Sequence, residues 1–274
     1  MPVPRLAWQQ LPGAVHAAVA ARIGGPYTAA DTQGGANSGV AALLHPHDGG
    51  HEVFVKGLPV DYAHGDYLDT ERKVNPYLPG SAPRLRWHIQ AGGWRLLGFD
   101  AISGRHADLA PGARDLDLIV DALTQTGAVL APDIALLSAW DRWGYYCTPA
   151  DEAVLTGRHL LHTDLAATNI LIGTDRAHLV DWSWAAVGPP WVDAALWAMR
   201  LISDGGHSPE QARHQAMRIP AFAAAPPQAV HLLADAEARR WQDLSDDGVP
   251  GIESVTKGSR LWADFWSPTV DRRR

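Results

Sequence analysis

The stretch LLHTDLAATNILIG, residues 160–173, places a histidine, a carboxylate and an amide between two apolar runs. The second of these runs and the apolar run AHLV flank the turn sequence GTDR, and this pattern predicts a β-hairpin. Asn169 would begin the first strand of the hairpin, and Asp181 would end the second. Both polar side chains, together with Asp164, are therefore expected to converge at one end of the hairpin.

Oxygen-bearing side chains that converge in this way can bind a divalent metal ion or take a proton. Two carboxylates and an amide are ligands that Mg²⁺ accepts in proteins. A carboxylate that the metal does not occupy can orient a hydroxyl group and take its proton. The alternative is that Asp164 only caps a turn, so the rest of the chain has to decide between the two interpretations.

Length and composition favour a globular protein of two lobes. The chain has 274 residues, of which 46% are hydrophobic and 19% are charged, so it can bury a substantial core. We expect an α+β protein with a small sheet lobe over residues 1–100 and a larger, mainly helical lobe over residues 101–274.

Charge and cysteine content exclude some classes of partner and site. The net charge of -7 argues against a general nucleic-acid or membrane-surface protein, and no apolar run reaches the roughly 18 residues of a membrane span. The N-terminal segment does not resemble a signal peptide, and the single cysteine, Cys147, fits a reducing compartment. A cytoplasmic location is therefore expected. A nucleophilic role for Cys147 is the less favoured alternative, and oligomeric state is not indicated.

The N-terminal hundred residues alternate between helical and strand patterns. Apolar residues at helical spacing predict a first helix within residues 11–22 and another within 66–80. Short runs rich in valine and alanine predict strand, turn and strand over 31–59, and two further strands over 87–104 that join at Gly92-Gly93.

Beyond residue 104 the pattern is mainly helical. Helices are predicted over residues 112–127, 131–143 and 148–161, and over 208–217, where Ser208 and Gln211 form a capping box.

Three histidines surround the turn HPHDGG, at positions 45, 47 and 51. Such a cluster raises the possibility of zinc binding, but a fourth partner at the usual spacing is absent from the sequence. Solvated histidines in a turn are the favoured interpretation.

Several motifs together resemble one known family. HTDLAATN followed by VDW is similar to the H-x-D-x-x-x-x-N and Asp-Trp motifs of the aminoglycoside phosphotransferase and choline kinase branch of the protein-kinase-like fold. GPPWVDAALWA (188–198) resembles the family's Pro-x-x-Asp-Leu-Ala segment. VFVK ends in Lys56, which is similar to the phosphate-anchoring strand lysine, and GGANSG (34–39) resembles the phosphate-covering loop. The matched order extends from about residue 31 to residue 200.

The resemblance implies roles for the residues of the central motif. Asp164 would be the catalytic base or the carboxylate that orients the hydroxyl group, and Asn169 and Asp181 would bind Mg²⁺. His162 would be buried beneath the catalytic loop. Asp193 would brace that loop through hydrogen bonds to its backbone.

The resemblance also implies a nucleotide site in the N-terminal half. Lys56 would contact the α and β phosphates of ATP or GTP and would be held by Glu71. The alternatives are a solvated lysine at a strand end and an ordinary surface glutamate. The other nucleotide contacts implied are Gly35 and Ser38 in the phosphate-covering loop, and Asp100 and Ile102 at the hinge.

The function implied is transfer of the γ-phosphate of ATP or GTP to a hydroxyl group of a small molecule. The acceptor would be an antibiotic of the aminoglycoside kind, which would make the protein a resistance enzyme, or a hydroxylated metabolite. A pseudokinase that only binds ligands is the first alternative. A protein kinase is the second, and it is disfavoured because Thr163 replaces the usual arginine and only eleven residues separate Asp181 from Asp193.

Overall fold

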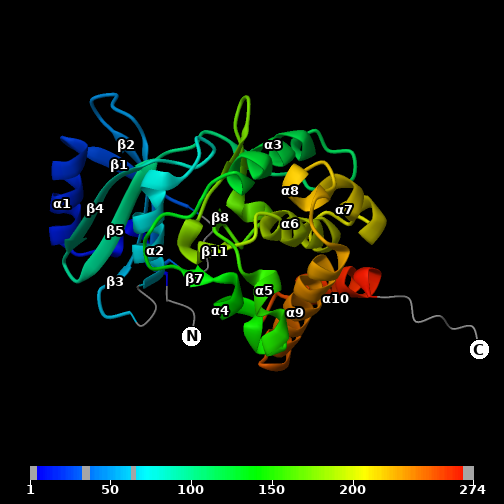
Figure 1. Ribbon diagram of the computed structural model, residues 1–274. Coiled ribbons are helices and arrows are strands. Elements are labelled where there is room, and N and C mark those ends of the chain that lie inside the picture. Colours follow the sequence, from blue (N-terminus) through cyan, green and yellow to red (C-terminus); the bar gives the residue numbers. More distant parts are fainter. Residues whose placement is uncertain (1–4, 33–37, 63–65, 268–274) are drawn as a thin grey trace, which may run out of the picture. The chain divides into compact units, whose positions relative to one another are not determined.

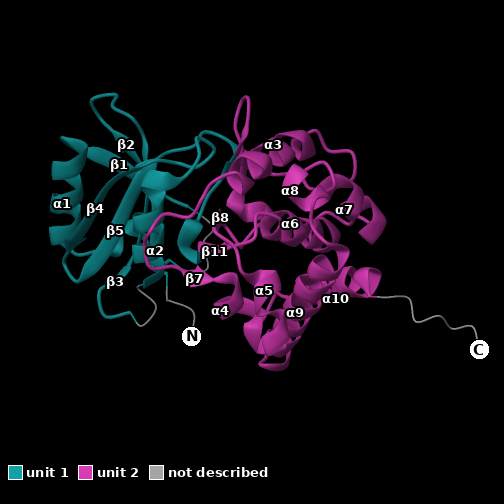
Figure 2. Cartoon of the chain, viewed as in Figure 1, with its two compact units in different colours: residues 1–104, 178–184 teal, residues 105–177, 185–274 magenta. Residues whose placement is uncertain are grey.

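The computed structural model describes residues 5–32, 38–62 and 66–267. The chain forms two compact units, shown in different colours in Figure 2. Unit 1 consists of residues 1–104 and 178–184, and unit 2 consists of residues 105–177 and 185–274. The chain therefore enters unit 1 twice, the second time with a segment of seven residues that includes Asp181.

Unit 1 is built on an antiparallel five-stranded sheet with the order β1-β2-β3-β5-β4 (Figure 1). Its strands are β1 (Tyr27–Asp31), β2 (Val40–Pro46), β3 (Val53–Pro59), β4 (Leu85–Ala91) and β5 (Trp94–Asp100). Its helices are α1 (Gly13–Ile23) and α2 (Asp66–Val74), with short 3₁₀ turns η1 (Trp8–Gln10), η2 (Asn75–Tyr77) and η6 (Trp182–Trp184). The predicted strands and both predicted helices are confirmed, whereas β1 lies largely outside the predicted strand region.

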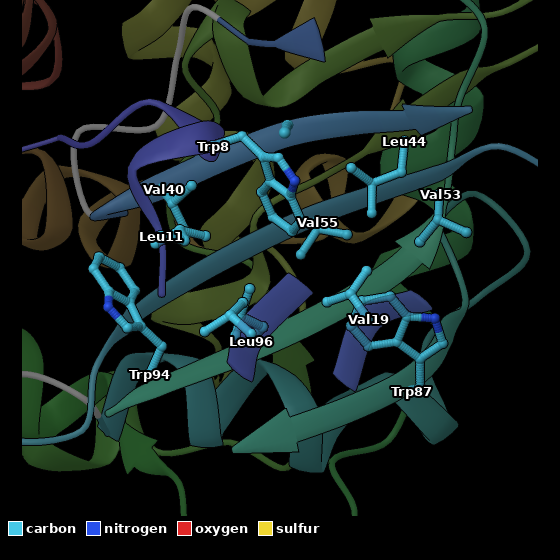
Figure 3. Packing of buried hydrophobic residues seen from close by; sticks show 12 residues of the cluster. Trp8, Leu11, Val19, Val40, Leu44, Val53, Val55, Trp87, Trp94 and Leu96 are labelled. Carbon is cyan, nitrogen blue, oxygen red and sulfur yellow. The ribbon is translucent and has the colours of Figure 1, made fainter. Parts of the chain in front are cut away.

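One face of the sheet carries the main core of unit 1. Val15 and Val19 of α1 pack against apolar side chains of the strands. Figure 3 shows this layer, whose labelled members include Trp8, Leu11, Val40, Leu44, Val53, Val55, Trp87, Trp94 and Leu96.

The opposite face of the sheet carries a separate apolar cluster, because side chains alternate between the two faces along β3. Val53 and Val55 belong to the core beneath α1, whereas Leu58 packs with Leu68 of α2 and with Leu97. Because side chains alternate along a strand, Lys56 points to the same face as Leu58. The local pattern of β3 thus directs the Lys56 ammonium group toward α2.

Unit 2 is mainly helical. Its helices are α3 (Asp115–Gly127), α4 (Ala139–Trp143), α5 (Glu152–Leu155), α6 (Val192–Ser203), α7 (Pro209–Ala216), α8 (Pro220–Ala223), α9 (Pro227–Asp246) and α10 (Glu253–Trp266), with 3₁₀ turns η3 (Gly144–Tyr146), η4 (Pro149–Asp151) and η5 (Ala167–Asn169). A small sheet has the order β7-β11-β8, made of Leu137–Ser138, Ala186–Gly188 and His159–Leu161. Two strands, β6 (Arg105–His106) and β9 (Ile170–Ile172), pair antiparallel, and β10 (Ala177–Leu179) leads the chain back into unit 1.

Two local predictions for unit 2 are confirmed in detail. The hydroxyl of Ser208 accepts a hydrogen bond from the amide of Gln211, which caps α7 as the sequence indicates. The amide of Gly173 donates to the carbonyl of Arg176 at 2.9 Å, which closes the turn between β9 and β10. Asn169 itself ends η5 and does not begin the first strand of the hairpin.

Two predicted helices are largely wrong. Within 131–143 only residues 139–143 are helical, because Ser138 caps the helix at that point and residues 137–138 pair with β11. Within 148–161 the helix is limited to residues 152–155, and residues 159–161 pair with β11 instead. In both cases pairing with a distant strand overrides the helical period.

No helix in the part of the chain that the structure describes is both long and apolar enough to cross a membrane.

The close contact between Gly98 and Trp87 allows the packing of unit 1 to be tested by substitution. These residues are cross-strand partners, and a Cβ atom at position 98 would overlap the indole ring of Trp87. Gly98→Ala is expected to lower the free energy of unfolding by about 1–3 kcal/mol, as overpacking usually does. Gly13→Ala is the matched control, since its Cβ would meet nothing within 4 Å. Equal urea midpoints for the two variants would contradict this packing.

Candidate functional site

A buried ion-pair network in unit 1 joins Lys56 and Glu71, which the sequence resemblance assigns to the nucleotide site, with Asp181, which it assigns to Mg²⁺. Lys56 Nζ lies 2.7 Å from Glu71 Oε2 and 2.8 Å from Asp181 Oδ1. The other Glu71 oxygen accepts the amide of Trp182 at 3.2 Å, and Ser183 Oγ donates to Asp181. Lys56 and Glu71 are 6% and 3% exposed, so the interpretations as a solvated lysine and a surface glutamate are wrong.

The network fixes the charges of its members. Burial opposes the charged form of Lys56, but Asp181 and Glu71 outweigh it and raise the pKa of this ammonium above its usual value. Burial raises the pKa of Glu71 to about 6; Lys56 opposes this shift and Asp181 adds to it. Lys56 therefore stays protonated at neutral pH and offers a fixed positive charge.

The other predicted nucleotide contacts have different environments. Gly35 lies outside the described residues, and Ser38 is buried. The amide of Asp100 donates to the carbonyl of Arg84, and its side chain pairs with Arg86. A contact from this hinge to a nucleotide base would therefore come from a carbonyl group or from Ile102, which is half-buried beyond the end of β5.

In unit 2 the segment that carries Asp164 is anchored by α6. The carboxylate of Asp193 accepts the amides of His162 and Thr163 at 2.8 and 2.9 Å. His162 is fully buried, and its Nδ1 lies 3.3 Å from the amide of Asp164. The predicted bracing by Asp193 and the predicted burial of His162 are both confirmed.

The braced loop presents Asp164 beside Asn169. Asn169 Nδ2 donates to the Oδ2 of Asp164 at 2.9 Å and to its carbonyl oxygen at 3.2 Å. The Asp164 side chain is 30% exposed, so a ligand can reach it. The structure thus brings together two of the three residues expected to converge. The approach of Asp181 stays a prediction, since Asp181 belongs to unit 1.

The residues expected to hold Mg²⁺ have suitable donor atoms. The amide nitrogen of Asn169 faces Asp164, which leaves its carbonyl oxygen as the atom for a cation. Asp181 supplies a carboxylate, and hard oxygen donors of these two kinds match the preference of Mg²⁺. Asn169 and Asp181 therefore fit the ion that the sequence resemblance implies.

Two alternative sites find no support. Cys147 donates its thiol to the carbonyl of Trp143, and burial raises the pKa of the thiol, so the reactive thiolate is disfavoured. His45 pairs with Glu52 at 2.6 Å. Within the described ranges no group of three or more histidine, cysteine, aspartate or glutamate residues could hold a metal ion.

A polar cluster on α9 was not predicted from the sequence. Glu237 is buried and accepts four hydrogen bonds, two from Arg240 at 2.8 and 2.7 Å and one each from the indoles of Trp143 and Trp241. The only local signal is the sequence Arg-Arg-Trp at 239–241, which is unusual on a helix with a buried face.

A second contact missed from the sequence involves Asp164 directly. Arg200 Nη2 on α6 lies 3.3 Å from Asp164 Oδ1. Position 200 follows Asp193 by seven residues, which is two helical turns, so both side chains lie on one face of α6. That spacing was visible in the sequence, and one helix face therefore both braces the loop and contacts its carboxylate.

Comparison with known proteins finds similarity only at the level of structure. No family model and no curated protein matches the chain. A mutant of aminoglycoside phosphotransferase APH(4)-Ia in complex with AMP-PNP and hygromycin B aligns with a TM-score of 0.60 and 14% identity over 92% of this chain and 97% of its own. A candidate fructosamine-3-kinase from Haemophilus somnus aligns with a TM-score of 0.59 and 12% identity over 95% and 99% of the two chains.

A third similar structure is the choline kinase LicA from Streptococcus pneumoniae, with a TM-score of 0.59 and 11% identity over 91% of this chain and 98% of its own. At these identities the similarity establishes the fold. The predicted protein-kinase-like fold is confirmed.

The environment of Glu237 predicts a pH-dependent contribution to stability. Burial alone would raise its pKa, but Arg240, aided by Trp143, lowers it to about 2. A lowered pKa stabilises the folded state above the unfolded value of about 4.5, and this stabilisation is lost as the pH falls toward 2. Glu237→Gln is expected to cost on the order of 3 kcal/mol at pH 7, and the difference from wild type should shrink below pH 4.5.

Urea unfolding between pH 3 and pH 7 measures this difference. Glu253→Gln, at an exposed glutamate in the first turn of α10, is the control. A Glu237→Gln deficit that does not change with pH would show that the charge of Glu237 does not stabilise the fold.

Proposed function

We propose that the protein is a small-molecule O-phosphotransferase that transfers the γ-phosphate of ATP or GTP to a hydroxyl group. The observation that carries this proposal is the loop of residues 162–169, in which Asp193 fixes two backbone amides and Asp164 is presented beside Asn169. In a chain with the protein-kinase-like fold, this arrangement is suited to orienting a hydroxyl group next to a metal ligand.

Unit 1 would bind the nucleotide. Lys56 carries a fixed positive charge for the phosphates, and Glu71 holds the Lys56 ammonium group through an ion pair. Asp181 shares this ammonium group and would turn its carboxylate to Mg²⁺ together with Asn169. The ion, when bound, would neutralise negative charge on the phosphates. The AMP-PNP complex of the similar aminoglycoside phosphotransferase supports nucleotide binding.

Unit 2 would bind the acceptor and carry the catalytic residue. Asp164 would accept a hydrogen bond from the acceptor hydroxyl and take its proton as the oxygen forms a bond to the γ-phosphorus. The bond from that phosphorus to the β-γ bridging oxygen breaks, and the nucleoside diphosphate leaves. The products are a phosphate monoester and the diphosphate, with the proton on Asp164 released afterwards.

The short segment after Asp181 favours a small-molecule acceptor over a protein. Residues 182–184 form η6, residues 186–188 form β11, and α6 begins at residue 192. This leaves no length for a loop that phosphorylation could order, as in many protein kinases. A pseudokinase would share the fold but transfer no phosphate, and an assay of nucleotide consumption separates it from an enzyme.

Asp164→Asn tests the assignment of the catalytic residue. The substitution keeps the shape of the side chain but removes its ability to take a proton, so turnover should fall by about 10²- to 10⁴-fold. Nucleotide binding should be nearly unchanged, since Asp164 lies outside unit 1. Phosphate transfer and nucleotide affinity are measured on the same preparation, and turnover within threefold of wild type would remove Asp164 from this role.

Asp181→Ala tests the metal site. Loss of one of the two protein ligands should abolish the dependence of nucleotide binding on Mg²⁺. Calorimetric titration with nucleotide, with and without Mg²⁺, measures this dependence, and Asp121→Ala on the exposed face of α3 is the control. An unchanged effect of Mg²⁺ in Asp181→Ala would move the metal site elsewhere.

A further inference from the structure

The carboxylate of Asp181 receives two donors on one of its oxygens. Lys56 Nζ lies 2.8 Å from Oδ1 of Asp181, and the hydroxyl group of Ser183 donates to the same Oδ1. The two donors come from different elements, β3 and η6. Because the backbone fixes the Cα and Cβ atoms of Asp181, contacts that fix Oδ1 also determine the orientation of the whole carboxylate.

The turn that carries Ser183 is anchored on both sides of this residue. Before it, the amide of Trp182 donates to Glu71 Oε1 at 3.2 Å. After it, the ring of Trp184 packs on Tyr67 with centres 4.5 Å apart. Ser183 itself is 5% exposed. Its hydroxyl group therefore has a fixed place from which to hold the carboxylate.

The two donors to Asp181 are not equivalent once a nucleotide is bound. The ammonium group of Lys56 also pairs with Glu71 at 2.7 Å, and in the proposed function it contacts the phosphates as well. Each added partner weakens its hold on Asp181. A hydroxyl group has one proton to donate, and Ser183 gives it to Asp181 from a buried position. The contact from Ser183 can therefore persist when Lys56 turns toward the phosphates.

The two donors also differ in their effect on charge. An ammonium group offsets the negative charge of Asp181 that would attract a cation. A hydroxyl group is neutral, so Ser183 orients the carboxylate and leaves that charge in place. A neutral donor is thus the better partner for a carboxylate that has to bind a metal ion.

We propose that Ser183 is a positioning residue of the metal site, whose hydroxyl group holds the carboxylate of Asp181 in place for Mg²⁺ while Lys56 contacts the phosphates. This inference rests on the proposed function and adds to it a residue that acts through Asp181. Groups that hydrogen-bond to metal-binding side chains commonly contribute about 10- to 100-fold to metal affinity.

A test with ADP and Mg²⁺ alone does not depend on the identity of the acceptor. The affinity for ADP is measured by calorimetry in EDTA and over a series of free Mg²⁺ concentrations. Ser183→Ala removes the hydroxyl group, so the Mg²⁺ concentration that gives half of the full effect should rise by about 10- to 100-fold. The affinity for ADP in EDTA should stay within threefold of wild type, because Lys56 is unchanged.

Further variants separate the hydroxyl group from packing. Ser183→Thr keeps the hydroxyl group and should need Mg²⁺ at a concentration within threefold of wild type. Ser259→Ala is the matched control, since Ser259 is 1% exposed and its hydroxyl group donates to the carbonyl of Thr256 at 2.9 Å in unit 2. This control loses a buried serine hydrogen bond but should keep the Mg²⁺ requirement of wild type. If Ser183→Ala does not fold, Ser183→Cys replaces it with the same expectation, because a thiol is a weak donor.

The outcomes separate failure of the inference from failure of the proposed function. A Mg²⁺ requirement of Ser183→Ala within twofold of wild type overturns the inference and leaves a phosphotransferase in place. Equal increases in Ser183→Ala and Ser183→Thr, or in Ser183→Ala and Ser259→Ala, also overturn it, because the hydroxyl group at position 183 would not be their cause. Wild-type protein whose affinity for ADP does not respond to Mg²⁺, measured first, would instead contradict the proposed function.

Discussion

One buried ammonium group organises the part of unit 1 that is proposed to bind the nucleotide. Lys56 lies on a strand face where an unpaired charge would be costly, and two carboxylates from distant parts of the chain compensate it. Asp181 is 125 residues away in sequence, so its ion pair requires the chain to return from unit 2. The returning segment is held further by the amide of Trp182 on Glu71 and by the ring of Trp184 against Tyr67, with centres 4.5 Å apart.

Backbone strain occurs at or beside the two carboxylates, Asp164 and Asp181, that are proposed to act in phosphate transfer. Thr163 and Asp181, with φ of 68° and 63°, are the non-glycine residues in left-handed conformation within the described ranges. This conformation is especially unfavourable for a β-branched residue such as threonine. Asp193 offsets the strain at Thr163 through a hydrogen bond to its amide, and Lys56 holds the carboxylate of Asp181. The strain persists because buried charges on other elements fix both positions.

Much of the fold could be predicted from local pattern, and the failures share one cause. The helix over residues 115–127 follows a strong helical period. The strands joined at Gly92-Gly93 follow from a turn that needs glycine, since these two residues have φ values of 54° and 79°. The incorrect helices lie where residues 137–138 and 159–161 pair with β11. That strand is 25 or more residues away, and no local period encodes the pairing.

The same distinction applies to the site. The spacing of Asp164 and Asn169 within one loop, and the placement of Lys56 and Glu71 on successive elements, could be predicted because motif order carries them. The contacts of Arg142, Arg200 and Arg240 could not, because these residues lie on three helices that meet only in the folded unit. Charged residues on helices are usually solvated, so no local pattern indicates that these three side chains are partly buried in one unit.

The basic side chains near Lys56 and near Asp164 differ in kind. Of 23 basic residues only three are lysine, and one of these is the buried Lys56. A compact ammonium group can exchange one oxygen partner for another, which suits a phosphate chain that enters and leaves. Around Asp164 the cations are arginines instead.

Arginine also serves a structural purpose in unit 2 that lysine could not. Arg240 uses two nitrogens on Glu237 at once, and a single ammonium nitrogen could not reproduce that geometry. Burial would readily neutralise a lysine at position 142, whereas Arg142, with a pKa of about 10, keeps its charge at neutral pH. The positive charges of Arg142 and Arg240 therefore persist at neutral pH, and Glu237 holds the guanidinium group of Arg240 in a fixed direction.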